Sequence, residues 1–421
     1  MFDSVSIALI ISSLIILIGF LANYFFNKTS LPDMLILIFL GILFGPILGV
    51  FNPTAVKSFA PYIAALALAY ILFDGGIGLN IRKVVFNSPR AVLLAVLGFV
   101  FSVLGVGLFM VIVFNVPLVY GLLFGSIFGG SSSVVVISLA SKIKISEKAS
   151  ITLILESAIT DILCIVISLS ILDVIVTGQT DVGSIGLGIA GKFLIGAVIG
   201  LVLGVAWLFA LRKVASIPFS YMLTLGIVLL GYAASEGLGG SGALSALLFG
   251  LILGNEREIL RILRQSGYTD NEVVSNAKLY LFVSKGLKRF EAEVAFLIRT
   301  FFFVFLGIIV SISSWSTLLF GVLLSLILLA TRFGAVLITT FKSSLQTERQ
   351  IMTLILTRGL AAAVLATLPA QYGLPYSNLF VDLAVVVIVT TAVIATIGAL
   401  ALSRKKELPT LNNEKMVIKE K

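Results

Sequence analysis

Long apolar runs are the feature of this sequence that most constrains its fold. About thirteen of them recur along the 421 residues, each near the roughly twenty residues that a helix needs to cross a bilayer. The chain is 59% hydrophobic and only 12% charged, which is too apolar for a water-soluble globule of this length. The runs lie at residues 5–26, 32–51, 58–79, 89–114, 117–141, 149–178, 184–211, 216–234, 240–254, 291–312, 315–341, 350–371 and 380–403. The sequence therefore predicts an all-α integral membrane protein with about 13 transmembrane helices.

Positive charges identify one side of the predicted membrane. Most lysines and arginines follow odd-numbered runs, whereas the connections after even-numbered runs contain only Lys57. Because cytoplasmic loops hold an excess of these residues, the pattern predicts a multi-pass protein of the cell (inner or plasma) membrane, with its N-terminus outside and its C-terminus cytoplasmic. The net charge of +9 comes from these flanks rather than from one basic domain, so no nucleic-acid partner is expected. Membrane lipid is the partner that the composition implies.

The connections predict how the chain is divided. Residues 1–403 form the membrane domain, and residues 404–421 form a basic cytoplasmic tail. The one long connection, at residues 255–290, carries the segment Ile259-Leu260-Arg261-Ile262-Leu263-Arg264, which is typical of an amphipathic helix on the cytoplasmic surface.

The residue inventory limits the available chemistry. There is no histidine, and Cys164 is the single cysteine, so neither a disulfide framework nor a thiolate metal cluster can be built. No nucleophile–base set or phosphate loop is apparent, and we expect neither an enzyme nor a bound cofactor. A protein of this composition that carries protons must do so on a carboxylate or a lysine.

Two apolar runs are interrupted by residues that a membrane helix should avoid. The fifth contains Gly129-Gly130-Ser131-Ser132-Ser133 and the twelfth contains Thr357-Arg358-Gly359. The breaks lie seven helices apart, and an odd offset places the two helices in opposite membrane orientations. This pattern predicts an inverted-topology repeat with two interrupted crossing helices (spans 5 and 12), as in secondary transporters. The alternative for the fifth span is close helix packing through small residues.

The sixth span carries two carboxylates within one apolar helix, Glu156 and Asp161. At 3.6 residues per turn, Ser157 shares a face with Asp161, whereas Glu156 falls on a neighbouring face with Thr160. A buried charge needs a partner or an aqueous cavity. We expect Glu156 to form a structural ion pair with Arg332, which leaves Asp161 for an exchangeable ion. Alternatively, Asp161 pairs with the second arginine, Arg358, and only holds helices together.

Other polar residues complete the predicted site. Ser157, Thr160, Ser131 and Ser132 lie near Asp161 or in the fifth-span break, where hydroxyls and freed carbonyls can serve as oxygen ligands for Na+ or K+ at Asp161. Arg358 is expected to compensate carbonyl ends at the second break. Asp74, near the cytoplasmic end of the third span, is a candidate entry or gating acid, or else an interfacial residue without a transport role.

These elements together resemble the cation:proton antiporter superfamily, across nearly the whole chain. The resemblance rests on Leu-Phe-Asp-Gly-Gly at 72–76, the interrupted fifth span, Glu156-Ser157 with Thr160-Asp161, the segment 241–255, and the arginines of spans 11 and 12. The layout is most similar to NhaP-type sodium/proton antiporters. Sodium exchangers usually carry Thr-Asp-Pro at the fifth-span break, however, and Ser131-Ser132-Ser133 is more similar to the potassium-efflux branch.

The resemblance implies an oligomeric state and two groups of spans with different roles. It implies a homodimer, with scaffold spans at residues 1–79 and 184–312 and a moving core at residues 89–178 and 315–403. Electrogenic relatives carry a second acid at the position of Thr160, so the resemblance implies electroneutral 1:1 exchange.

The expected function is therefore secondary active antiport of a monovalent cation for H+, by alternating access, with Asp161 as the shared cation and proton site. Such activity would serve pH homeostasis. Na+ is the preferred cation, with Li+ as a further substrate, and K+/H+ antiport is the alternative. A cation channel or a membrane sensor that does not transport are the alternatives from other classes.

Overall fold

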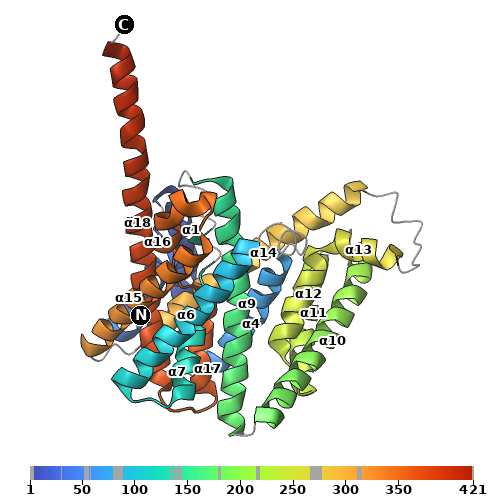
Figure 1. Ribbon diagram of the computed structural model, residues 1–421. Helices are drawn as coiled ribbons and strands as arrows, with labels where there is room; N and C mark the ends of the chain where they lie inside the picture. Colours follow the sequence, from blue (N-terminus) through green and yellow to red (C-terminus); the bar gives the residue numbers. More distant parts are fainter. Residues whose placement is uncertain are drawn as a thin grey trace. The chain divides into compact units, whose positions relative to one another are not determined.

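The computed structural model describes residues 4–29, 31–51, 56, 58–78, 89–132, 135–136, 139, 145–178, 182–214, 219–265, 277–310 and 315–419 (Figure 1). The described residues form helices and no strands. The elements are α1 (Ser4–Thr29), α2 (Asp33–Ile42), the π-helix η1 (Leu43–Ile47), α4 (Ala60–Gly78), α6 (Pro89–Phe114), α7 (Leu118–Ile127), α9 (Glu147–Thr177), α10 (Val182–Val214), α11 (Ser220–Gly237), α12 (Gly242–Gly254), α13 (Glu256–Gln265), α14 (Ala277–Ile309), α15 (Trp315–Thr339), the 3-10 helix η3 (Ser344–Glu348), α16 (Arg349–Leu354), α17 (Leu360–Gln371) and α18 (Ser377–Lys419).

The helices coincide with the predicted apolar runs. Within the described residues, 8 helices are long and apolar enough to cross a membrane by length and composition, and shorter apolar helices lie at Asp33–Ile47, Leu118–Ile127, Gly242–Gly254 and Leu360–Gln371. Large apolar side chains such as Leu187 and Trp315 are 77% and 87% exposed, as expected where lipid is the solvent. The all-α membrane fold is confirmed, whereas the count of thirteen crossings stays a prediction.

The chain divides into two compact units. Unit 1 comprises Met1–Ser58, Ser88–Ser168 and Phe303–Lys421, and unit 2 comprises Phe59–Asn87 and Leu169–Phe302. The first two spans and residues 303–312, which are predicted as scaffold, belong to unit 1, and residues 169–178 of the predicted core belong to unit 2. The assignment of a moving role and a scaffold role stays a prediction.

Unit 1 brings the interrupted spans together with α6, α9, α15 and α18. Glycines allow α6 and α7 to approach closely: a Cβ atom on Gly125 would lie 2.4 Å from the carbonyl oxygen of Val103. The rings of Phe124 and Phe380 stack with centroids 3.6 Å apart, and α15 packs against both α6 and α18. This packing fixes the helix ends from which the candidate site is built.

Unit 2 centres on α12, which packs against α4, α10 and α11. A Cβ atom on Gly250 would lie 2.2 Å from the carbonyl oxygen of Phe73, so α12 and α4 are in backbone contact. The predicted amphipathic segment forms α13, but much of the 255–290 connection already belongs to α14. Residues 266–276 lie outside the described residues. In Figure 1, α18 continues as one helix through most of the basic tail.

Candidate functional site

The two interrupted spans cross at their breaks. Helix α7 ends at Ile127, and residues 128–132 are not helical; residues 355–359 separate α16 from α17. The backbone N–H of Ser132 donates a hydrogen bond of 2.7 Å to the carbonyl of Thr357. The crossing predicted from the two breaks is therefore confirmed. Ser133 and Val134 lie outside the described residues.

Gly359 permits this close approach. An ideal Cβ atom at this position would lie 2.5 Å from Ser132 Oγ and 2.6 Å from Ser132 Cβ. These distances are far inside van der Waals contact, so a larger residue at 359 must push the two breaks apart.

Gly359→Ala is expected to destabilise the protein by about 1–3 kcal/mol, because the added methyl group overpacks the crossing. The measurement is the thermal midpoint of the detergent-solubilised protein, together with proton flux after reconstitution. Gly98→Ala is the matched control, because a Cβ atom there meets nothing within 4 Å. If Gly359→Ala retained the midpoint and flux of Gly98→Ala, the tight crossing would be contradicted.

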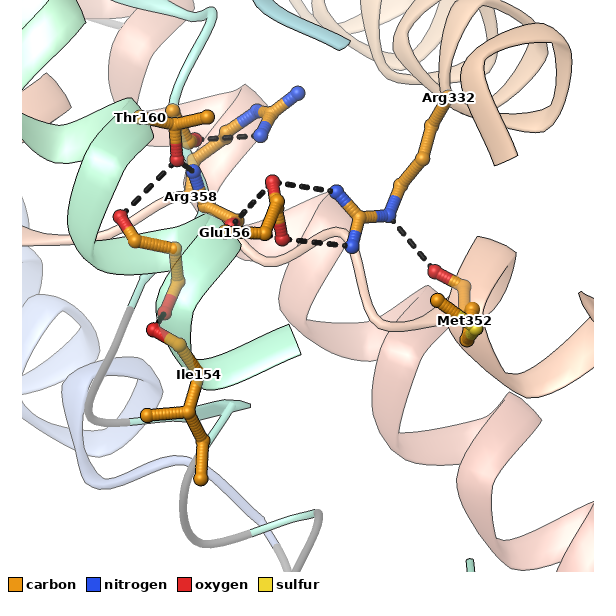
Figure 2. Close-up of polar contacts among 9 residues, drawn as sticks. Ile154, Glu156, Thr160, Arg332, Met352 and Arg358 are labelled. Atoms are coloured by element: carbon orange, nitrogen blue, oxygen red, sulfur yellow. Dashed lines mark hydrogen bonds and ion pairs between the residues drawn. The ribbon is translucent and has the colours of Figure 1, made fainter. Parts of the chain in front are cut away.

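A buried ion pair lies beside the crossing. Arg332 Nη1 and Nη2 donate to Glu156 Oε1 and Oε2, each at 3.2 Å, so the guanidinium and the carboxylate form a bidentate pair (Figure 2). Arg332 Nε donates to the carbonyl of Met352 at 2.9 Å, just before the second break. Glu156 is 1% exposed and Arg332 is 4% exposed. The structure thus contains the predicted pair and ties it to the twelfth span.

Hydroxyl groups link this pair to the fifth-span break. Ser131 Oγ donates to both carboxylate oxygens of Glu156, at 3.1 and 3.2 Å. The backbone N–H of Ser131 donates to Thr160 Oγ1 at 3.2 Å, and Thr160 Oγ1 donates to the carbonyl of Ser157 (Figure 2). Ser157 Oγ donates to the carbonyl of Ile154 at 3.0 Å. Each of these hydroxyls gives its hydrogen to the protein, and all three side chains are 0% exposed.

Arg358 connects the two breaks. Its Nη1 donates to the carbonyl of Gly130, and its backbone N–H donates to Thr391 Oγ1 at 3.2 Å. Sequence reasoning assigned this arginine to carbonyl ends of the second break, whereas this contact is to the first. The Nη1 contact of Arg358 thus reaches the fifth-span break, and its predicted role at the carbonyl ends of the second break stays a prediction.

Asp161 follows this network directly on α9. It is partly exposed, in contrast to the buried Glu156 one and a half turns earlier. Asp161 and Glu156 both interact electrostatically with Arg358. Two acids and two arginines thus share this region, and Asp161 is the more exposed of the two acids.

The remaining sequence-predicted acid belongs to the other unit. Asp74 belongs to α4 in unit 2, where it interacts electrostatically with Arg299 of α14. Its role as an entry or gating acid stays a prediction. Lys192 and Asp173 form an ion pair in the same unit.

Sequence reasoning missed three contributors to the crossing, namely the Met352 carbonyl, the Thr357 carbonyl and the Thr391 hydroxyl. Backbone carbonyls have no sequence signal of their own. For Thr391, the only available signal was a hydroxyl pair, Thr390-Thr391, within an otherwise apolar run.

Solved structures and curated proteins resemble this chain along most of its length. The structure of the sodium proton antiporter MjNhaP1 from Methanocaldococcus jannaschii at pH 8 matches with a TM-score of 0.73 and 22% identity, covering 97% of this chain and 99% of that chain, which shows a shared fold. The K(+)/H(+) antiporter NhaP2 of Shewanella baltica strain OS223 is 26% identical over 97% of this chain and 68% of its own length. The probable Na(+)/H(+) antiporter 2 of M. jannaschii is 25% identical over 81% and 79%.

The family model described as "Sodium/hydrogen exchanger, transmembrane" matches residues 11–404. That range includes both breaks, both arginines of the site and the two acids of α9. The chain therefore belongs to the sodium/hydrogen exchanger family.

Proposed function

We propose that this protein is a secondary antiporter that exchanges a monovalent cation for H+, with Asp161 as the shared binding site. The observation that carries the proposal is the crossing of two unwound segments beside one partly exposed carboxylate. Carbonyl and hydroxyl oxygens gather there, which suits a hard alkali cation. Family membership and the names of the relatives support antiport as the activity.

The charges of the region support 1:1 exchange. With Asp161 ionised, the acids Glu156 and Asp161 balance the cations Arg332 and Arg358. A proton or one monovalent cation at Asp161 adds the same single positive charge. The two loaded forms are therefore electrically equivalent, so a cycle that exchanges one for the other moves no net charge and does not respond to membrane potential.

The first cation to test is Na+, with Li+ beside it, because the overall layout resembles sodium exchangers. A K+/H+ antiporter is the second candidate. It is favoured by the hydroxyls of Ser131 and Ser132 at the fifth-span break, and by the K(+)/H(+) names of relatives from Shewanella baltica and Alkalimonas amylolytica.

The proposal includes a membrane location, a topology and an oligomeric state. The charge bias of the loops supports a multi-pass protein of the cell membrane with an external N-terminus and a cytoplasmic C-terminus. We propose a homodimer, which light scattering of the purified protein tests directly. We also propose transport without enzymatic chemistry, because the site offers ligand oxygens and one exchangeable acid.

The deciding experiment is proton flux into proteoliposomes, read by an internal pH dye while Na+, Li+, K+ or Rb+ is added. If only Na+ or Li+ dissipates the pH gradient, the protein is a Na+/H+ antiporter. If only K+ or Rb+ dissipates it, the protein is a K+/H+ antiporter. Linear currents far above exchanger turnover would reveal a channel. Cation binding without flux would reveal a sensor.

Competition at Asp161 predicts a specific pH dependence. As the pH falls, the apparent KM for the driving cation should rise while Vmax stays constant, because the proton and the cation occupy the same carboxylate in turn. The measurement is a cation titration of initial flux at several symmetric pH values. A falling Vmax at constant KM would place the controlling proton on another group.

A further inference from the structure

The side-chain hydroxyl of Thr357, at the crossing, has no role in the site as described above. The Thr357 side chain is 0% exposed, and its Oγ1 atom has no hydrogen-bond partner among the described residues. Leaving a buried hydroxyl in this state is unfavourable, so such groups are normally satisfied by protein, water or a bound ion. Thr357 Oγ1 therefore needs a partner from a water molecule or a bound ion.

The backbone of Thr357 lies at the point where the two breaks meet. Its carbonyl accepts the N–H of Ser132 at 2.7 Å. The preceding residue, Ser131, donates its N–H to Thr160 Oγ1 at 3.2 Å, and Asp161 is the next residue on α9. A short chain of contacts thus connects Thr357 to the exchangeable acid.

Neighbouring hydroxyls differ from that of Thr357. Thr160 Oγ1 donates to the Ser157 carbonyl, and Thr391 Oγ1 donates to the Val387 carbonyl at 2.7 Å. Ser131 Oγ donates to the Glu156 carboxylate. Those oxygens are oriented by the protein itself, whereas Thr357 Oγ1 has no such contact with the described residues.

The coordination that an alkali cation needs is a further reason to expect a ligand from the second break. The adjacent Arg358 directs Nη1 to the carbonyl of Gly130 on the first break. An alkali cation needs several oxygen ligands to replace its hydration shell, and one carboxylate supplies too few.

We propose that the Thr357 hydroxyl is a ligand of the transported monovalent cation, so that the twelfth-span break contributes an oxygen to the site at Asp161. This inference rests on the proposed antiport function. It assigns a substrate-binding side chain to the second break, whereas the ligands predicted from sequence all come from spans 5 and 6.

Thr357→Val tests the proposal, because valine keeps the shape of threonine and removes the oxygen. The matched control is Thr367→Val, which removes a buried hydroxyl on α17 that already donates to the Val364 carbonyl at 2.7 Å. Thr357→Ser restores an oxygen at the tested position. Two quantities are measured for each protein with NaCl and with KCl: initial proton flux against cation concentration, and the rise in thermal midpoint that the salt produces, with choline chloride as the ionic-strength reference.

Thr357→Val is expected to raise the KM for the driving cation about fivefold to tenfold, as for the loss of one polar contact. It should reduce the cation-induced rise in thermal midpoint accordingly, since stabilisation depends on occupancy. Thr357→Ser should recover most of both quantities, and Thr367→Val should retain the wild-type KM.

Unchanged KM and unchanged salt stabilisation in Thr357→Val would overturn the proposal, and flux in the same vesicles would show that the antiport function still stands. If Thr357→Val changed the thermal midpoint by the same amount in every salt and left KM unchanged, the hydroxyl would bind a structural water. That result would also overturn the proposal. Wild-type protein without cation-driven flux would instead refute the proposed function, while the salt-stabilisation assay would still report whether Thr357 binds a cation.

Discussion

Asp161→Asn is expected to reduce cation-driven proton flux to the level of empty vesicles. Asparagine keeps the size of the side chain and one of its two oxygens, but it can neither take up a proton nor offer a negative charge at neutral pH. Since a single carboxylate is proposed to carry both substrates in turn, its loss stops both half-cycles. The measurement is the same dye assay, with the amount of reconstituted protein matched between variants.

Asp173→Asn is the matched control for this experiment. Asp173 lies on the same helix and pairs with Lys192 in a partly exposed position, so its removal should leave flux within about twofold, in keeping with the small energies of such pairs. Asp161→Glu retains an exchangeable acid and should keep measurable transport with an altered cation KM. Wild-type flux in Asp161→Asn would refute Asp161 as the shared site.

The sequence predicted the fold because lipid imposes strict rules on a chain. In a bilayer, the length of an apolar run, the charges beside it and a glycine–hydroxyl interruption each indicate one structural feature. The ends of α7 and α16 and the start of α17 lie at the breaks that glycine, serine and arginine indicated. The Glu156–Arg332 pair was predictable for the same reason, because a buried charge needs a partner and few were available.

Details of the site were less predictable because they depend on how two separate breaks approach each other. The reach of Arg358 to Gly130 depends on the crossing, and a single sequence does not contain the distance between two breaks that lie more than two hundred residues apart. The hydrogen bond from the Arg358 N–H to Thr391 has the same origin. So has the Thr357 hydroxyl, which has no partner in the part of the chain that the structure describes. Periodicity identifies the face of one helix, whereas these contacts join irregular segments of several spans.

The second large effect is expected from separation of the buried ion pair. Arg332→Met should destabilise the protein by about 3–5 kcal/mol, because it leaves the carboxylate of Glu156 without its countercharge in a buried position. Ser131 Oγ still donates to that carboxylate, but one hydroxyl replaces only part of a bidentate guanidinium. The measurement is the thermal midpoint of the solubilised protein, supported by its yield as a monodisperse species.

A double-mutant cycle shows whether the pair itself is responsible. Glu156→Gln combined with Arg332→Met removes both charges, so the double variant should be more stable than Arg332→Met alone and the two effects should not add. Lys192→Met is the control, because this lysine is 43% exposed in its pair with Asp173 and should cost no more than about 1 kcal/mol. Additive effects would mean that the two side chains act independently. In that case Arg332 would stabilise the site mainly through its hydrogen bond to the Met352 carbonyl, and the twelfth span rather than Glu156 would be its principal partner.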